Sequence, residues 1–459
     1  MRKHDQPVRH MKTHLDRLWQ TFDILFVTGL AVALFLGSKV TPLLVVAGVL
    51  PIPFLLHKLK DRELHVPLRT LLAPFGLYFV YSLLALFFFT GLAPSDPKPV
   101  NPSLEFYAVA IAMLAVGLTR GLQVRNLAEI LHRLMPGLLL ACFLLLTYLM
   151  FAGIRDACRV RGLAPWPFIP ALLFSTLALL TLVGWERFSA RERWMRATIL
   201  ALSIVVSTTF TGSRGVAVAQ LGVFGCLFLL SILPAFRNKL PHWHHLGSAV
   251  AGGVFVSLSI GLATTCGPAD RFSSTATTLE SLVSRLTAPK VSTETAATAK
   301  LPALPTVESN QQPKSETASD TLAQATSDEA ISQRLAMWQT SIAAIKESPV
   351  FGHGSLYLQK LISEPYGYQH NHNQYLTWLV TGGLLQLALG LVFLAVPWFV
   401  STGLSLADRL LLTIAVSLLW GIAMMFDSFL NLKFYTHYYC LLCGVLYAFV
   451  NSLREGDAR

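Results

Sequence analysis

The sequence predicts an all-α polytopic membrane protein with about twelve transmembrane helices and one long outer loop that carries amphipathic helices. Of its 459 residues, 53% are hydrophobic and 13% are charged, and the mean hydropathy is +0.54. A chain this apolar does not suit a soluble domain, and it is too long for a single span. Apolar stretches of about 18 or more residues, enough to cross about 30 Å of hydrocarbon, recur along the chain.

Nine spans are expected before the long loop and three after it. The first nine are placed at 19–37, 40–56, 70–92, 104–119, 130–153, 165–185, 194–211, 215–235 and 246–265. The last three are placed at 373–400, 410–427 and 435–452. The chain therefore divides into an N-terminal membrane region, a long loop and a C-terminal membrane region, at 1–265, 266–372 and 373–459.

The distribution of Lys and Arg predicts the orientation, because short cytoplasmic loops retain positive charge. With both termini inside, the inside segments hold 21 of the 36 basic residues and the short outside loops hold seven. The loop 266–372 then lies on the outer face of the membrane. The net charge of +11 reflects this topology. It does not indicate nucleic-acid binding, for which the chain has no motif.

The long loop is not uniform along its length. Its centre, about 288–329, is rich in Thr, Ala, Ser and Pro and almost free of aromatic residues, so we expect a disordered tether. Apolar residues at helical spacing over 279–286 predict one amphipathic helix before the tether. A second is expected to be capped by Ser327 and to end before Pro349. Both are short enough to lie on the outer membrane surface.

Arginines stand at the outer ends of predicted spans and beside the amphipathic helices. Arg214 follows Thr-Gly-Ser and opens a span, where a planar guanidinium and the free N–H groups of a helix start suit a phosphate. Arg285 and Arg334 flank the apolar faces of the two loop helices. These positions favour an anionic ligand at the outer surface.

Two histidines precede the tenth predicted span, in "HNHNQYLTWLVTGG" (370–383). A neutral histidine, with a reference pKa of about 6.5, is suited to act as a general base. His370 and His372 therefore mark the boundary between the long loop and the membrane as a candidate reaction site.

Three stretches together resemble the signatures of the bacterial O-antigen ligase and O-antigen polymerase family. They are "TGSRG" (211–215), "RLAMWQTSIAAIKESPVFGHGS" (334–355) and the histidine stretch (370–383). The ligases carry His, then Asn, Ser or Gln, nine residues, Gly, two residues and then Gly, Thr or Tyr. His372-Asn373 followed by Gly383 fits this pattern, with Gln386 as a departure at its last position, and the spacing selects His372 over His370.

The resemblance implies a glycosyltransferase of the GT-C type in the inner membrane of a Gram-negative bacterium, with its site on the periplasmic face. It would transfer O-antigen polysaccharide from undecaprenyl pyrophosphate to a sugar hydroxyl of lipid A-core, with inversion and without a metal or other cofactor. His372 would be the base, supported by Asn373, His370 and Gly383. Gly382 and Gly383 are also expected to let a neighbouring helix pack closely behind it. The residues implied at the lipid pyrophosphate are Arg214 and Arg334, then Arg285 or Arg271, with Arg155, Arg159 and Arg161 adding to the anionic-lipid site.

Other functions are weighed against this one. An O-antigen polymerase would use the same chemistry, and a protein O-oligosaccharyltransferase is a further alternative within the family. A lipid-linked glycan transporter would place charges inside the membrane, whereas the spans here are nearly free of charge. Asp427 is the main exception, and we expect it at the outer end of a helix. A zinc site of the two histidines with His353 or His437 is not expected, because residue types alone fix no geometry. Among the cysteines, Cys158 and Cys266 are those expected to face the outer compartment, and no disulfide framework is predicted.

Overall fold

A computed structural model describes most of the chain. The described residues are 5–36, 41–53, 57, 64–87, 104–124, 126–132, 136–137, 140, 168–211, 213–237, 239–263, 319–368 and 370–457. Every regular element within them is helical and no strand occurs among them, which confirms the all-α prediction.

The helices fall into two groups along the chain. The group before the long loop comprises α1 (Asp5–Leu36), α2 (Thr41–Val49), α4 (Arg69–Phe87), α5 (Leu104–Gln123), α7 (Phe168–Leu180), α8 (Ala190–Val205), α9 (Arg214–Ile232) and α10 (Trp243–Ala263), with short turns η1 (Trp185–Arg187) and η2 (Val206–Phe210). The later group comprises α12 (Ser319–Glu347), α13 (Ser355–Tyr366), α14 (Gln374–Leu394), α15 (Val396–Val400), α16 (Leu406–Thr413), η3 (Ile414–Leu418), α17 (Leu419–Ala423), η4 (Phe429–Asn431) and α18 (Lys433–Asp457).

Four described helical stretches are long and apolar enough to cross a membrane. They are Glu105–Gln123, Arg214–Ile232, Gln374–Leu394 and Leu406–Ala423, the last running from α16 through η3 to α17. These apolar helices identify a membrane protein. The predicted total of twelve spans extends over residues outside the described ranges and stays a prediction.

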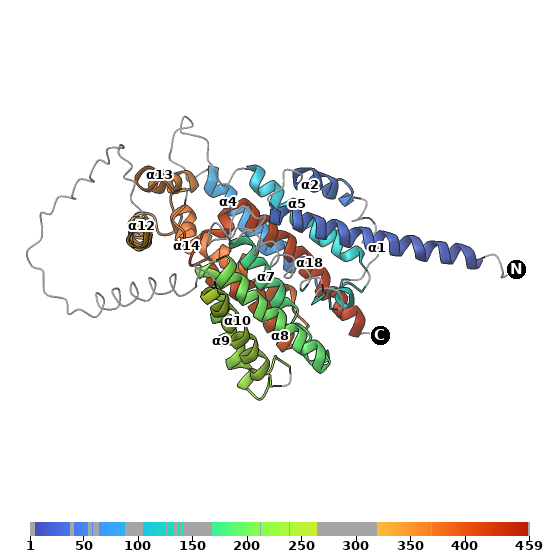
Figure 1. Ribbon diagram of the computed structural model, residues 1–459. Coiled ribbons are helices and arrows are strands. Elements are labelled where there is room, and N and C mark those ends of the chain that lie inside the picture. Colours follow the sequence, from blue (N-terminus) through green and yellow to red (C-terminus); the bar gives the residue numbers. More distant parts are fainter. Residues whose placement is uncertain are drawn as a thin grey trace, which may run out of the picture.

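The helices form an elongated bundle with distinct ends (Figure 1). Helices α12 and α13 lie at one end, beside the start of α14, whereas the first turns of α1 and the last turns of α18 lie at the other. The predicted topology, with the long loop on the outer face and both termini inside, requires that α12 and α13 lie at the end opposite the two termini. The orientation in the membrane nevertheless stays a prediction, because the structure contains no bilayer.

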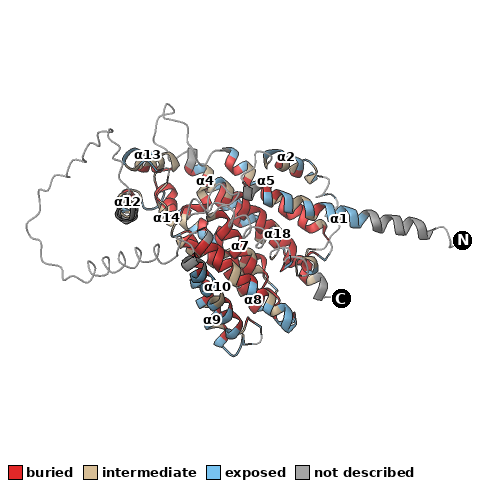
Figure 2. Cartoon of the chain, viewed as in Figure 1, coloured by how far each residue is buried: buried red, intermediate tan, exposed pale blue. Residues whose placement is uncertain are grey.

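The centre of the bundle is built around α5 and α18. A Cβ atom at Gly117 of α5 would collide with the Leu441 carbonyl, and one at Gly444 of α18 would lie 2.6 Å from the Leu114 carbonyl. Both positions therefore need glycine for the two backbones to come this close, as is usual between membrane helices. Buried residues concentrate on α5, α7 and α18 (Figure 2).

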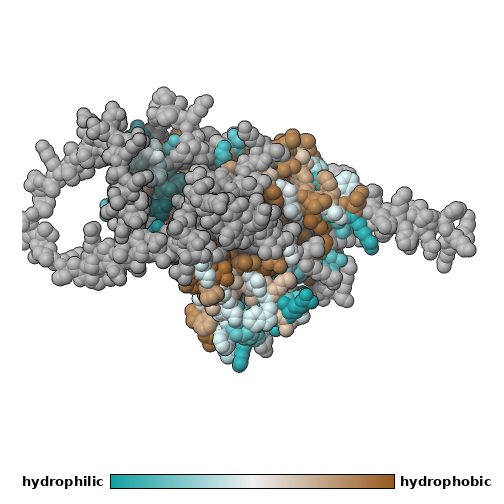
Figure 3. Space-filling view, viewed as in Figure 1, coloured by the Kyte–Doolittle hydropathy of each residue, from teal (hydrophilic) through white to brown (hydrophobic). Residues whose placement is uncertain are grey.

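The outward faces of α9 and α10 are apolar. Leu229 and Phe255, for example, are 67% and 71% exposed. Hydrophobic residues cover much of the middle of the described surface, and hydrophilic ones lie nearer its ends (Figure 3). Acyl chains would cover such a surface in a bilayer. Within the bundle, Arg120 of α5 and Asp23 of α1 form a buried ion pair, a charged contact that the prediction of nearly charge-free spans did not include.

The second loop helix differs from its prediction. Helix α12 begins at Ser319, eight residues before the expected cap at Ser327, so the tether predicted over 288–329 is wrong for its last part. The residues from 321 to 329 contain neither Gly nor Pro, so they can adopt a helix. The C-terminal half of α12 is packed against other elements, and from there the helix can extend toward its N-terminus. The helix predicted over 279–286 lies outside the described residues.

Candidate active site

A tight turn at 370–373 leads into α14. His372 has a φ of 54°, in the left-handed region that few residues other than glycine adopt. The next residue, Asn373, caps α14: its side-chain oxygen accepts hydrogen bonds from the backbone N–H groups of Tyr375 (3.0 Å) and Leu376 (3.1 Å). A left-handed residue costs about 1–3 kcal/mol and persists where its surroundings fix it. The hydrogen bonds of the residues on both sides of His372 fix its backbone in this conformation.

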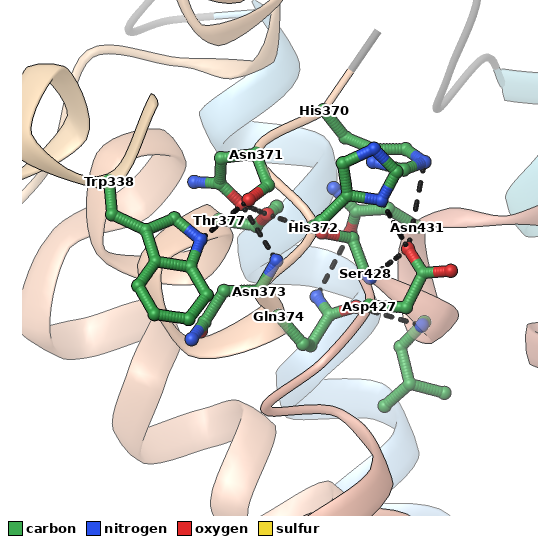
Figure 4. A network of polar contacts seen from close by, with 11 residues as sticks. Trp338, His370, Asn371, His372, Asn373, Gln374, Thr377, Asp427, Ser428 and Asn431 are labelled. Atoms are coloured by element: carbon green, nitrogen blue, oxygen red, sulfur yellow. Dashed lines mark hydrogen bonds and ion pairs between the residues drawn. The ribbon is translucent and has the colours of Figure 1, made fainter. Parts of the chain in front are cut away.

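Asn371 fixes the turn from within. It is fully buried, and its side-chain oxygen accepts hydrogen bonds from Asn373 N–H (3.1 Å) and the Thr377 hydroxyl (2.8 Å). Its amide donates to the Ser341 hydroxyl (3.2 Å). Its backbone carbonyl accepts from the Trp338 indole (2.8 Å) (Figure 4). Ser341 and Trp338 belong to α12, so Asn371 joins α12 to the start of α14.

A second segment, 424–431 between α17 and α18, fixes the turn from the other side. The Met424 carbonyl accepts from Gln374 N–H (2.9 Å), and the Met425 carbonyl accepts from the Asn373 amide (3.2 Å). The Gln374 side chain accepts from Leu430 N–H (2.8 Å) and donates to Asn431 (3.2 Å). These bonds position Asp427, the residue at the middle of the segment.

Asp427 lies directly against both histidines (Figure 4). Its Oδ1 atom is 3.3 Å from His372 Nδ1 and 3.8 Å from His370 Nε2, and it also accepts a hydrogen bond from Ser428 N–H (2.8 Å). The two imidazole rings are 4.4 Å apart and nearly perpendicular. The side chains of both histidines are 17% exposed and that of Asp427 is 9% exposed, so the group is largely shielded from water.

Electrostatics keeps Asp427 ionised and His370 neutral. Burial opposes the charge on Asp427, but the hydrogen bonds from His372 and from Ser428 N–H, together with the favourable electrostatics of the two imidazoles, outweigh it and hold the pKa of Asp427 below its usual value. Burial lowers the pKa of His370, and the Asp427 carboxylate offsets only part of that effect. At neutral pH the cluster therefore contains a carboxylate that only accepts hydrogen bonds.

Two of the predicted arginines lie on elements that meet this cluster. Arg334 is one turn before Trp338 on α12, the helix that bonds to Asn371, and its charge adds a small part to the lowering of the pKa of His370. Arg214 begins α9, where the next residue, Gly215, packs against Phe426. A Cβ atom at Gly215 would lie 2.7 Å from that of Phe426. The start of α9 thus borders the segment that carries Asp427.

The remaining predictions have different outcomes. Arg155, Arg159, Arg161, Arg271 and Arg285 lie outside the described residues, as do Cys158 and Cys266. His353 stacks on Tyr357 and contacts the Ala344 carbonyl (2.8 Å), and His437 contacts the Phe106 carbonyl (3.1 Å). Neither residue joins His370 and His372.

Residues 170–395 match the family model described as O-antigen ligase. The chain contains an O-antigen ligase family domain. Such a domain identifies a membrane enzyme of the glycosyltransferase type, as the three sequence signatures suggested. A search of curated proteins finds no relative of this chain.

The O-antigen ligase match ends at residue 395, and Asp427 lies beyond it. Sequence reasoning treated Asp427 as the end of an outer helix and gave Asn371 no role. The signal that could have indicated Asp427 is its rarity, since it is an acidic residue at the end of an otherwise apolar span. No such signal marks Asn371, because its role depends on α12 and α14 meeting in space.

The glycines of the ligase motif serve a purpose different from the one predicted. Gly382 and Gly383 were expected to let a neighbouring helix pack closely, but they break α14: Gly383 has φ 65° and ψ −159°, a conformation essentially restricted to glycine. The backbone of the loop 349–354 fills the break. Val380 and Thr381 carbonyls accept from His353 N–H (2.7 Å) and Gly354 N–H (2.8 Å), and Leu384 N–H donates to the Pro349 carbonyl (2.8 Å).

The departure from the motif at Gln386 also has a structural role. Its side-chain oxygen accepts from the Thr381 hydroxyl (2.6 Å) across the break, and its amide donates to Ser82 of α4 (3.3 Å). The carbonyl of Gly382 accepts from the Tyr81 hydroxyl (2.8 Å). Gln386 therefore stabilises the broken helix, and the departure does not remove a residue from the histidine cluster.

Gly383→Ala is expected to lower the stability of the domain markedly. A Cβ atom there would collide with the Val350 carbonyl, and the backbone conformation alone costs about 1–3 kcal/mol for a residue other than glycine. The midpoint of thermal unfolding in detergent measures the effect. Gly76→Ala in α4 is the control, because its Cβ would meet nothing within 4 Å. Equal midpoints for the two variants would contradict the structure of the break.

Proposed function

We propose that the protein transfers a glycan from a polyprenyl pyrophosphate, undecaprenyl pyrophosphate in its bacterial host, to a sugar hydroxyl of lipid A-core at the outer face of the inner membrane. The family match supports a glycan-transferring membrane enzyme with lipid-linked substrates. The observation that carries the proposal is the contact of Asp427 with His372 Nδ1 (3.3 Å). It gives the histidine of the ligase motif the arrangement of a general base with an orienting carboxylate.

The tautomer of His372 follows from the partner of its Nδ1 atom. An ionised Asp427 can only accept a hydrogen bond, so Nδ1 carries the proton and the lone pair lies on Nε2. In the proposed reaction Nε2 takes the proton of the acceptor hydroxyl while its oxygen attacks the anomeric carbon. The bond from that carbon to the pyrophosphate oxygen breaks, and the configuration inverts. Asp427 stabilises the imidazolium that forms.

The leaving pyrophosphate needs positive charge rather than a proton. Arg334, on the helix that bonds to Asn371, and Arg214, at the start of α9, are the proposed contacts. A helix start adds backbone N–H groups and the positive end of its dipole. Arg271, Arg285, Arg155, Arg159 and Arg161 stay candidates for the same anionic lipid.

Arg334→Ala is expected to lower the transfer rate about 10²- to 10³-fold, because it removes one electrostatic contact to the developing charge. Arg334→Lys should restore little, since an ammonium lacks the planar pair of donors. The rate is measured with purified protein, lipid-linked donor and rough lipopolysaccharide. Lys346→Ala is the control, an exposed cation at the end of the same helix. A wild-type rate for Arg334→Ala would remove Arg334 from the site.

The proposal is tested by deleting the gene and separating the lipopolysaccharide of the cells on a gel. A ligase predicts loss of all O-chains from the core, with lipid-linked polymer accumulating. A core that carries single repeat units would instead indicate the polymerase, and an unchanged profile with lost protein glycosylation would indicate a protein O-oligosaccharyltransferase. Complementation with His372→Ala, compared with wild type, ties the phenotype to the histidine cluster.

A further inference from the structure

Three residues that can bind a metal ion lie close together: His370, His372 and Asp427. One ligand atom from each residue, an imidazole nitrogen or a carboxylate oxygen, lies within 4.8 Å of the other two. They come from two segments 55 residues apart, the turn before α14 and the segment after α17. The hydrogen bonds of Asn371 and Gln374 hold the two segments against each other, so the three atoms are close together without an ion.

The spacing of these atoms approaches that of a transition-metal site. Zn–N and Zn–O bonds of about 2.0–2.2 Å in a tetrahedral arrangement place ligand atoms about 3.3–3.5 Å apart. Asp427 Oδ1 is 3.3 Å from His372 Nδ1 and 3.8 Å from His370 Nε2. Small side-chain rotations would bring all three atoms to bonding distance of one ion. His370 Nδ1 is buried without a hydrogen-bond partner, so no bond from that atom restrains its ring.

We propose that His370, His372 and Asp427 form an inhibitory binding site for Zn²⁺ and similar transition-metal ions. Two imidazole nitrogens and one carboxylate suit Zn²⁺, Co²⁺ or Cu²⁺, whereas Mg²⁺ and Ca²⁺ prefer oxygen ligands. Three protein ligands leave a coordination position for water. The sequence alone did not indicate this site, because its third ligand comes from a segment distant in the chain.

Inhibition follows from the two nitrogens of His372. A metal ion on Nδ1 replaces the proton there, and the neutral ring then carries its proton on Nε2. Nε2 no longer has the lone pair that accepts the proton of the acceptor hydroxyl. The metal bond also replaces the hydrogen bond to Asp427. The inhibitory half of the proposal rests on His372 acting as the base, whereas the binding half does not.

Metal binding is tested directly with the full-length protein, purified in detergent with a tag other than polyhistidine. Co²⁺ is added, and the visible absorption of nitrogen-coordinated Co²⁺ is titrated and then displaced by Zn²⁺. His370→Gln should weaken binding at least about tenfold, since even outer-shell changes at metal sites cost 10- to 100-fold. Mg²⁺ should not displace Co²⁺.

His244→Gln is the matched control, because His242, His244 and His245 form a separate histidine cluster before and in α10 with rings 4.1–6.3 Å apart. It should leave the Co²⁺ spectrum unchanged. Loss of the spectrum in His244→Gln with retention in His370→Gln would overturn the proposal, as would a wild-type protein without the spectrum.

A second experiment measures the transfer rate of wild type and of each variant with and without Zn²⁺. Wild type should lose most of its transfer rate with Zn²⁺ and recover it with EDTA, whereas His370→Gln should lose a smaller fraction of its own rate. Spectroscopic binding with no Zn²⁺ inhibition would overturn inhibition and challenge His372 as the base. Absence of binding would overturn the metal site and leave the proposed transferase function intact.

Discussion

His372→Ala is expected to lower the transfer rate about 10²- to 10⁴-fold, the usual contribution of a general base. The variant removes the only proposed proton acceptor but leaves Asn371 and Asn373, which fix the turn and cap α14. The protein should therefore insert and purify as wild type does. The rate is measured with purified protein at saturating donor and acceptor, where binding defects do not contribute.

His370→Ala is the matched control, because it removes the neighbouring imidazole of the same cluster. It should retain much more activity, since the 3.8 Å contact from His370 to Asp427 is longer than the 3.3 Å contact from His372. If His370→Ala is the inactive variant and His372→Ala is active, the assignment of the base is wrong. EDTA should not inactivate wild type, since the proposed mechanism needs no metal.

Asp427→Asn is expected to lower the rate on a similar scale, about 10²-fold or more, although Asp427 acts through His372 and does not touch substrate. The amide is nearly isosteric, but it carries no charge to stabilise the imidazolium and its N–H₂ group can turn toward Nδ1 and favour the wrong tautomer. Asp427→Glu, which keeps the charge, should restore part of the rate. The split between kcat and KM distinguishes the roles: kcat should fall and KM for the donor should change little.

Asp408→Asn controls for the general cost of changing a buried carboxylate. Asp408 lies in the first turn of α16, where its carboxylate accepts hydrogen bonds from the Ser405 hydroxyl (2.9 Å) and from Gly184 N–H (2.8 Å) and has no contact with His370 or His372. The variant should lower the thermal midpoint and leave the rate per folded molecule nearly unchanged. If Asp427→Asn behaved in the same way, Asp427 would be a structural residue.

The sequence predicted those features that depend on local pattern. Helical class and apolar stretches follow from composition and period, both of which are properties of neighbouring residues. The choice of His372 over His370 comes from the resemblance to the ligase motif and stays a prediction. Local pattern also located Arg214 at a helix start and Arg334 on a helix, and the structure has Arg214 at the start of α9 and Arg334 in α12.

Features that depend on distant segments were missed. Asp427 is 55 residues from His372, and only the packing of the segment after α17 against the turn brings them together. Gly383 was assigned to helix packing because a Gly-Gly pair in an apolar helix usually has that role. Its actual backbone conformation is set by the loop 349–354, whose hydrogen bonds cannot be inferred from periodicity.

The break in α14 has a consequence for how the protein is made. An isolated α14 entering the bilayer would leave the carbonyls of Val380 and Thr381 and the N–H of Leu384 without partners, at several kcal/mol each. Their partners belong to residues 349–354, which the ribosome synthesises before α14. The broken form of α14 can therefore be completed only when residues 349–354 are already beside it, so the break and the turn at His372 depend on a segment that is made earlier.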